Sequence, residues 1–111
     1  MALDFNNMKK ASLEIILNDE KQTKIHLYTP SKKLLTELMG LSKELSTITD
    51  DTIDIEGIDQ LYAICAKVMS RNRENITISS DKLESIFDME DLTIFLEAYI
   101  EFTAEVQSSK N

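Results

Sequence analysis

The sequence predicts an α+β domain that is mainly helical, with an N-terminal β-hairpin packed on a bundle of about four helices. Two short segments before residue 29 alternate apolar and polar residues with a period of two, which is typical of strands. The rest of the chain repeats its apolar residues at the helical spacing. A length of 111 residues indicates one domain that buries a core without disulfides. We expect this domain over residues 12–107, between a flexible N-terminus, 1–11, and a polar end, 108–111.

The hairpin is predicted from residues 13–17 and 23–28. One set of side chains shares a face in each strand: Leu13, Ile15 and Leu17 in the first, and Thr23, Ile25 and Leu27 in the second. The residues that connect them, 18–21, include no glycine, which favours a loop longer than a two-residue primed turn. Because an isolated hairpin is only marginally stable in water, its apolar face must pack on the helices.

The first helix is expected to begin at Thr29 and Pro30, since threonine caps a helix well and proline is tolerated at the first helical position. A polar connector, residues 47–54, follows it. The apolar stripe of this helix consists of Leu34, Leu35, Leu38, Met39, Leu41, Leu45 and Ile48.

The second helix is expected over residues 55–70 and should be the central one, because its apolar arc is broad. That arc holds Ile58, Leu61, Tyr62, Ile64, Cys65, Val68 and Met69. Arg71 and Arg73 follow it, where positive charge complements the C-terminal end of a helix. Residues 76–78 are expected to be extended.

A short helix is predicted to run through Phe87, with Asp81 and Glu84 as its capping pair. Asp88 is expected to cap the last helix, residues 89–107. The apolar arc of that last helix spans roughly 160°, wider than a single flat contact requires. It consists of Leu92, Phe95, Leu96, Tyr99, Phe102, Val106, Met89 and Ile100.

The opposite side of the last helix is acidic. It holds Glu90, Glu97, Glu101 and Glu105, with Ile94 among them. This side is either a solvated face or a docking stripe for a basic partner, with Ile94 as its apolar anchor. The candidate partner-binding residues are Ile94, Glu97, Ala98, Glu101 and Glu105. Charge matching at such a stripe speeds association more than it deepens affinity.

Composition excludes several classes of function. The chain holds 12 basic and 20 acidic residues, a net charge of -8, which argues against nucleic acid or an anionic membrane as a partner. A single cysteine excludes an internal disulfide and fits a reducing compartment. The first ten residues lack the apolar run of a signal peptide, and no segment is long and apolar enough to span a membrane. We therefore expect a cytoplasmic protein.

Nothing in the sequence predicts an enzyme, a cofactor or a metal site. The acidic stretch 50–57 lacks the glycine and the glutamate that a calcium loop requires at its sixth and twelfth positions. His26 is the single histidine and is expected to be a solvated strand residue. Cys65 lies within an apolar stripe, which predicts core packing rather than a nucleophile. The two glycines, Gly40 and Gly57, are too far apart for a phosphate-binding loop.

The order of segments along the chain forms a recognisable layout. The hairpin is followed by Leu27-Tyr28-Thr29-Pro30-Ser31-Lys32-Lys33-Leu34, Ile58-Asp59-Gln60-Leu61-Tyr62-Ala63-Ile64, Ile76-Thr77 ahead of Leu83-Glu84, Asp88-Met89-Glu90-Asp91-Leu92 and a closing amphipathic helix. This layout, over about residues 12–107, resembles that of the tail assembly chaperones of long-tailed bacteriophages and prophages of Gram-positive bacteria.

The resemblance implies a non-enzymatic protein of the host cytoplasm that is absent from the finished virion. Such chaperones hold the tape measure protein soluble while tail tube subunits polymerise around it. Many also exist as a longer frameshift product that recruits tube protein. A protein that holds a long client soluble also needs reversible self-association, which we therefore expect of this chain. The resemblance assigns no role to a single residue of this sequence.

Two other functions fit the sequence. A structural adaptor of the phage particle, such as a head–tail or tail-completion protein, would remain in purified virions. An acidic inhibitor that mimics DNA would need carboxylates spaced like phosphates, whereas the acids here are mostly interleaved with lysines outside the last helix.

Overall fold

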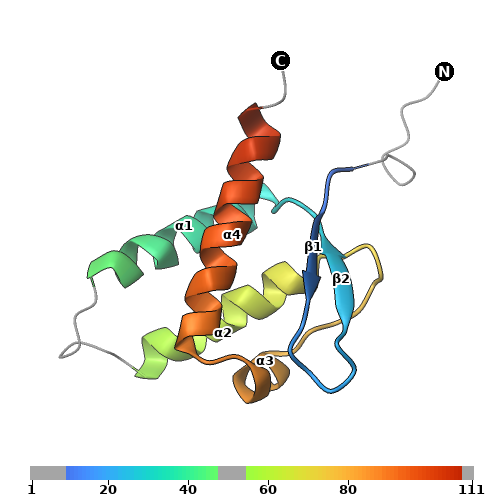
Figure 1. Cartoon of the computed structure of the whole chain (residues 1–111). Coiled ribbons are helices and arrows are strands. Elements are labelled where there is room, and N and C mark those ends of the chain that lie inside the picture. The colour runs from blue at the N-terminus through green and yellow to red at the C-terminus, as the bar shows by residue number, and fades with distance from the viewer. Residues whose placement is uncertain (1–9, 48–54, 109–111) are drawn as a thin grey trace.

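The computed structural model describes residues 10–47 and 55–108, and it confirms the predicted α+β, mainly helical fold (Figure 1). Within these ranges the elements follow in the order β1 (Leu13–Ile16), β2 (Lys24–Leu27), α1 (Lys32–Thr47), α2 (Ile55–Met69), α3 (Ser80–Ile86) and α4 (Met89–Ser108). The two strands form an antiparallel hairpin, and α4 crosses the other helices next to it.

The hairpin has the predicted face and the predicted longer loop. Ile15 pairs with Ile25, and the Leu17 amide donates to the Thr23 carbonyl at 2.8 Å. The Asp19 carboxylate closes the loop, because it accepts hydrogen bonds from the Thr23 amide at 2.8 Å and from the Thr23 hydroxyl at 2.6 Å. These bonds lower the pKa of Asp19, with a further contribution from Lys82 at 3.1 Å.

The segment after α2 covers the outer edge of β2. The Tyr28 amide donates to the Arg71 carbonyl and the Arg73 amide donates to the His26 carbonyl, each at 2.9 Å. Asn72 is buried between them, where its amide group donates to the carbonyls of Met69 and Ile76 at 2.7 Å. The sequence did not predict that residues 71–73 pair with the outer edge of β2.

Arg71 and Arg73 follow the end of α2, as the sequence predicted, and their side chains make hydrogen bonds to distant residues. The Arg71 guanidinium donates to the Thr29 carbonyl at 3.1 Å, and the Arg73 guanidinium donates to the Ser12 hydroxyl at 2.9 Å. They reach these residues because the chain after α2 runs along β2, which carries both side chains away from the helix end.

The predicted starts of α1 and α3 were wrong, whereas α2 and α4 begin at residues 55 and 89 as predicted. α1 begins at Lys32, and its cap is Ser31, whose hydroxyl accepts from the Leu34 amide at 3.2 Å. Ser79, rather than Asp81, caps α3. In both cases a serine next to the first helical residue reaches the free amides better than the residue that the sequence favoured.

Asp88 caps α4 as predicted. Its carboxylate accepts from the Asp91 amide at 2.9 Å, and Asp91 returns a bond to the Asp88 amide at 3.0 Å.

The core surrounds α2, which contacts α1, α3, α4 and β2 and is therefore the central helix, as predicted. The buried hydrophobic residues are Leu17, Ile25, Leu27, Leu34, Leu38, Leu61, Tyr62, Ile64, Cys65, Ala66, Val68, Met69, Ile78, Leu83, Leu92, Phe95, Leu96 and Tyr99. Met39 and Met89 were predicted to face the core and are exposed instead. Each methionine lies at the edge of the apolar arc of its helix, and the neighbouring elements cover that arc only in part. Ile48 and the connector 48–54 lie outside the described residues.

Candidate partner-binding surface

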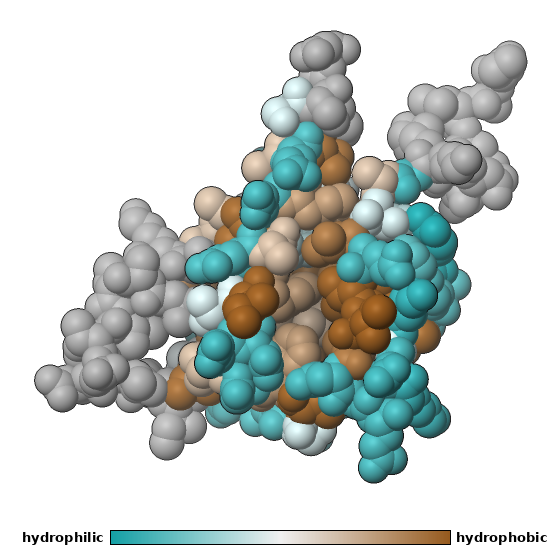
Figure 2. Space-filling view, viewed as in Figure 1, coloured by the Kyte–Doolittle hydropathy of each residue, from teal (hydrophilic) through white to brown (hydrophobic). Residues whose placement is uncertain are grey.

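A hollow of about 280 Å³ lies between the hairpin and α4. We call it the hairpin–α4 groove. Its lining comes from β1 and the hairpin loop on one side and from the end of α3 and the first half of α4 on the other: Ile15, Ile16, Leu17, Asn18, Phe87, Asp91, Ile94, Phe95 and Ala98. Figure 2 shows hydrophobic atoms gathered over this part of the face, between the polar atoms of α4 and those of the hairpin.

Two isoleucines make this groove an apolar surface. Ile16 is 61% exposed and Ile94 is 58% exposed, more than any other large hydrophobic residue that the structure describes. Strand alternation explains Ile16, because Leu17 points into the core and its neighbour must therefore point outward. Ile94 is exposed because its neighbour Phe95 fills the inward position on α4. Solvation of two such side chains is unfavourable, so the groove favours an apolar occupant.

One hydrogen bond fixes the lower end of the groove. The Asn18 side chain donates to the Ile86 carbonyl at 2.7 Å and so ties the hairpin loop to the end of α3. This bond holds the hairpin wall against the residues that lead into α4.

The sequence prediction located part of this surface. Ile94 and Ala98 line the groove together, as the candidate site required. Glu97, Glu101 and Glu105 are exposed on the same helix but do not line the hollow. Ile16 was missed as a site residue, although its place on the polar face of a strand was the signal that could have revealed it.

The electrostatics of α4 are one-sided. Between residues 89 and 108 the chain has no lysine or arginine, and its acids are Glu90, Asp91, Glu97, Glu101 and Glu105. No ion pair within the described residues involves any of these five. The carboxylates that are paired lie elsewhere, as in Glu14 with Lys24 at 3.4 Å. The groove is therefore flanked by uncompensated negative charge.

His26 is not the solvated residue that we expected. Its Nδ1 lies 2.6 Å from the Glu74 carboxylate, its Nε2 lies 3.8 Å from Glu14, and its backbone amide donates to Glu74 at 2.9 Å. The hydrogen bonds from the His26 ring and amide lower the pKa of Glu74. The cluster joins β2 to the segment that covers it, which is a structural role.

Cys65 packs in the core, as predicted. It is fully buried, and desolvation raises the pKa of its thiol to about 12. The thiol therefore stays protonated and out of reach of a substrate.

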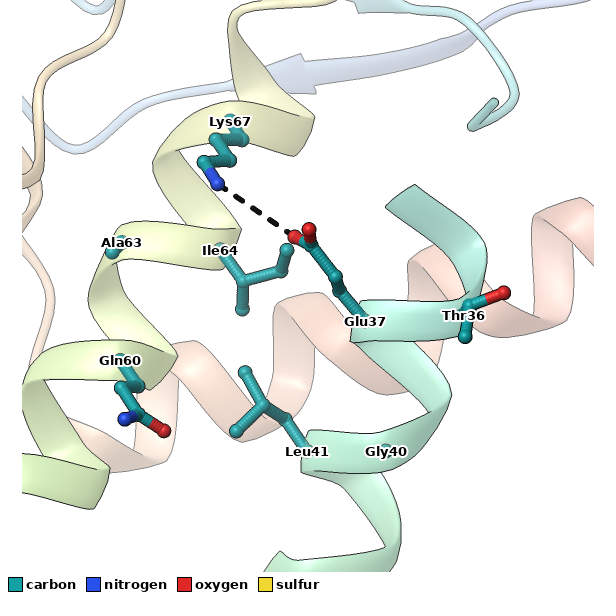
Figure 3. A pocket seen from close by; sticks show the side chains of 8 residues that line it. All are labelled: Thr36, Glu37, Gly40, Leu41, Gln60, Ala63, Ile64 and Lys67. Carbon is teal, nitrogen blue, oxygen red and sulfur yellow. Dashed lines mark ion pairs between the residues drawn. The ribbon is translucent and has the colours of Figure 1, made fainter. Parts of the chain in front are cut away.

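A second hollow, of about 390 Å³, lies between α1 and α2 (Figure 3). Leu41 and Ile64 extend between the two helices, and Lys67 pairs with Glu37 at 3.7 Å above them. Its other polar groups are the Thr36 hydroxyl and the Gln60 amide. This lining offers no nucleophile with an activating base.

No cluster of metal-ligating side chains occurs in the described parts of the chain. Most of the acidic stretch 50–57 lies outside those parts. Among the helices that the structure describes, none is long and apolar enough to cross a membrane.

Comparisons with protein-family models, curated proteins and solved structures returned no match to this chain.

Proposed function

We propose that this protein is a non-enzymatic tail assembly chaperone of a long-tailed bacteriophage or prophage. In this role it binds the tape measure protein in the host cytoplasm and keeps it soluble while the tail tube assembles. The observation that best supports the proposal is the hairpin–α4 groove, which exposed Ile16 and Ile94 both line, beside an acidic helix whose carboxylates make no ion pair within the described residues. A surface of this kind suits an apolar, basic polypeptide.

The size of the groove suits reversible binding. Burial of one aliphatic side chain contributes roughly 1.5–3 kcal/mol, which gives weak affinity at a single site. Several copies bound along one long client would act together and hold it more firmly. Tube subunits could then displace the copies one after another, so that the finished virion does not contain the chaperone.

The net charge of -8 supports the same role. Like-charged copies repel one another in solution, which opposes aggregation while the client is coated. Contact with tail tube protein would come from a longer frameshift product. A slippery heptanucleotide near the stop codon, with an overlapping second frame, would support the existence of that product.

Co-expression with the tape measure protein encoded downstream tests the proposal. We expect the client to be soluble with the wild-type chain and to precipitate with Ile94→Ser. Met39→Ser is the matched control, because Met39 is 51% exposed and lies on α1, outside the groove. A client that is equally insoluble with and without the wild-type chain would contradict the proposed function.

Mass spectrometry of purified virions separates the proposal from a structural adaptor. A chaperone is absent from the virion, whereas a head–tail or tail-completion protein is present in stoichiometric amounts. Detection at a fixed copy number per particle would favour the adaptor.

A further inference from the structure

Within the described residues, the outer edge of β1 has backbone groups without partners. The bond from the Leu17 amide to the Thr23 carbonyl marks a hydrogen-bonded pair of the antiparallel ladder. Such pairs alternate, so Ile15 and Leu13 also bond to β2, while Glu14 and Ile16 turn their N–H and C=O groups to the other side. In the described part of the chain, no backbone hydrogen bond satisfies Glu14 or Ile16 on that side.

The outer edge of β2 follows the same alternation, but its outward backbone groups at His26 are bonded, unlike those of Glu14 and Ile16. The same alternation turns the backbone of His26 away from β1, and both of its groups are bonded, to the Glu74 carboxylate and to the Arg73 amide. Among the described residues, β2 is thus bonded on its outer side at His26 and Tyr28, whereas β1 has no such bonds at Glu14 and Ile16.

The open edge borders the hairpin–α4 groove. The groove is lined by residues of β1 and α4 and by none of β2, so it runs along the free side of β1 (Figure 1). A strand placed there would lie about 4.8 Å from β1. It would cover Ile16 and contact Ile94 and Ala98 across the groove. Recognition of an extended segment between a strand edge and a helix is an established mode of peptide binding.

We propose that the hairpin–α4 groove binds an extended segment of the client, which adds to β1 as a third strand. The inference rests on the proposed function, since it names the part of the client that the chaperone takes up. The segment carries an aliphatic side chain that fills the space between Ile16 and Ile94. It also carries lysine or arginine on either side of that residue.

Charge identifies this occupant over a second copy of the same chain. Ile94, Ala98, Glu101 and Glu105 follow one another at helical spacings of four, three and four, so the apolar part of the stripe continues into an acidic part. A second copy joined through β1 would bring its own acidic α4 close to this one, which is repulsive. An extended basic segment offers backbone groups that can bond the edge of β1 and positive side chains that can pair with the carboxylates of α4.

The test uses the full chain and a fluorescein-labelled peptide, Lys-Val-Lys-Ile-Lys-Val-Lys. We expect saturable binding by fluorescence anisotropy, and none for the peptide in which glutamate replaces lysine. Glu14→Pro removes one outward N–H and leaves the ladder to β2 intact, while Glu14→Ala removes the same carboxylate and keeps the N–H. We expect Glu14→Pro to bind the peptide about fivefold more weakly than Glu14→Ala, the effect of one lost hydrogen bond.

Amide hydrogen exchange on the wild-type chain gives a second readout that needs no variant. We expect the peptide to slow exchange at Glu14 and Ile16 about tenfold or more, because these amides become part of a ladder. Leu13 and Ile15 already bond to β2 and should change little. Unchanged exchange at Glu14 and Ile16 under saturating peptide, equal affinity of the two Glu14 variants, or no binding at all would overturn strand addition.

The co-expression assay distinguishes the two proposals. If Glu14→Pro keeps the tape measure protein as soluble as Glu14→Ala does, the chaperone function stands and strand addition fails. If the peptide protects Glu14 and Ile16 but the client stays insoluble with the wild-type chain, the groove is a strand-binding site and the chaperone function fails.

Discussion

The hydroxyl of Tyr99 on α4 donates a 2.7 Å hydrogen bond to the carbonyl of Tyr28, 71 residues earlier in the chain. This bond links α4 to the end of the hairpin. Together with the bond from Asn18 to Ile86, it ties the hairpin to the helices at two separate places. The spacing between the two walls of the groove follows from these contacts.

Tyr99→Phe is expected to lower the free energy of unfolding by about 1 kcal/mol, because it leaves the Tyr28 carbonyl without its donor. Burial raises the pKa of Tyr99 to about 12, so the hydroxyl remains a donor over the whole neutral range. Urea unfolding measures the loss. Tyr28→Phe is the matched control, since its hydroxyl makes no hydrogen bond within the described residues and its loss should cost little. Equal losses in the two variants would show that the bond contributes nothing.

Thr103→Val should stabilise the protein by about 1 kcal/mol. Thr103 is buried on α4, and its hydroxyl has no hydrogen-bond partner among the described residues. Valine has nearly the same shape and removes the unsatisfied group. The midpoint of urea unfolding should rise without a change in slope. Thr93→Val on the same helix is the control, because it removes an exposed hydroxyl that already donates to the Met89 carbonyl at 3.0 Å and so should not raise the midpoint. A lower midpoint for Thr103→Val would contradict the prediction.

Cys65 should not react with iodoacetamide in the native protein at pH 8. Its side chain is fully buried and burial raises the pKa of the thiol to about 12, so neither access nor thiolate is available. The labelling rate should follow global unfolding, which mass spectrometry at increasing urea concentrations can measure. Rapid labelling without urea would mean that α2 opens locally.

The protein should lose stability in acid through Asp19. Its folded-state pKa lies below its usual value of 3.8, because the carboxylate accepts hydrogen bonds from Thr23 and pairs with Lys82. The unfolded state therefore takes up the proton first as the pH falls. The contribution is fully present above the unfolded pKa and disappears as the pH falls through the folded value.

Urea titrations at pH 7, 5 and about 3 check this prediction. Asp19→Asn should be less stable than the wild type at pH 7, and the difference should shrink toward pH 3. Glu20→Gln is the control in the same loop, because Glu20 makes no ion pair within the described residues. A constant difference between Asp19→Asn and the wild type at all three values would contradict the assignment.

Glu101→Lys should weaken binding of a basic client without unfolding the protein. Glu97 and Glu105 lie four residues away on either side, so the change replaces repulsion by attraction and should stabilise α4 by up to about 0.5 kcal/mol. Pull-down of the tape measure protein, with unfolding measured in parallel, tests both effects. Glu84→Lys on α3 makes the same change of charge away from the groove. Undiminished client capture by Glu101→Lys would remove the acidic stripe from the binding surface.

The spacing of apolar residues predicted the strands and helices well, because each of them buries one apolar face against the core. The alternation around Ile15 and Ile25 identified the hairpin, and the broad arc of the second helix identified the central element. Local capping was less predictable. Ser31 and Ser79 cap helices that the sequence placed at Thr29 and Asp81, since several residues near each helix start can accept the same amide bonds.

Only part of the α4 side of the candidate groove, Ile94 and Ala98, could be predicted. Ile94 stood out because it is apolar on an acidic face, and that property belongs to one helix alone. Ile16 could not be joined to it, because their proximity depends on how the hairpin packs beside α4. The pairing of β2 with residues 71–73 could not be predicted either, because it also depends on how distant segments pack. Backbone hydrogen bonds form at any residue type and therefore produce no side-chain pattern.

The sequence alone therefore determined which elements form, which faces are apolar, and that the last helix is acidic without a compensating base. Only the tertiary structure decided which edge of the hairpin stays open and which exposed apolar residues share one groove. The physical reason is that local hydrogen bonding and hydrophobic period act within a segment. The common groove of Ile16 and Ile94, and the backbone of Glu14 that has no partner among the described residues, depend on which distant segments pack nearby.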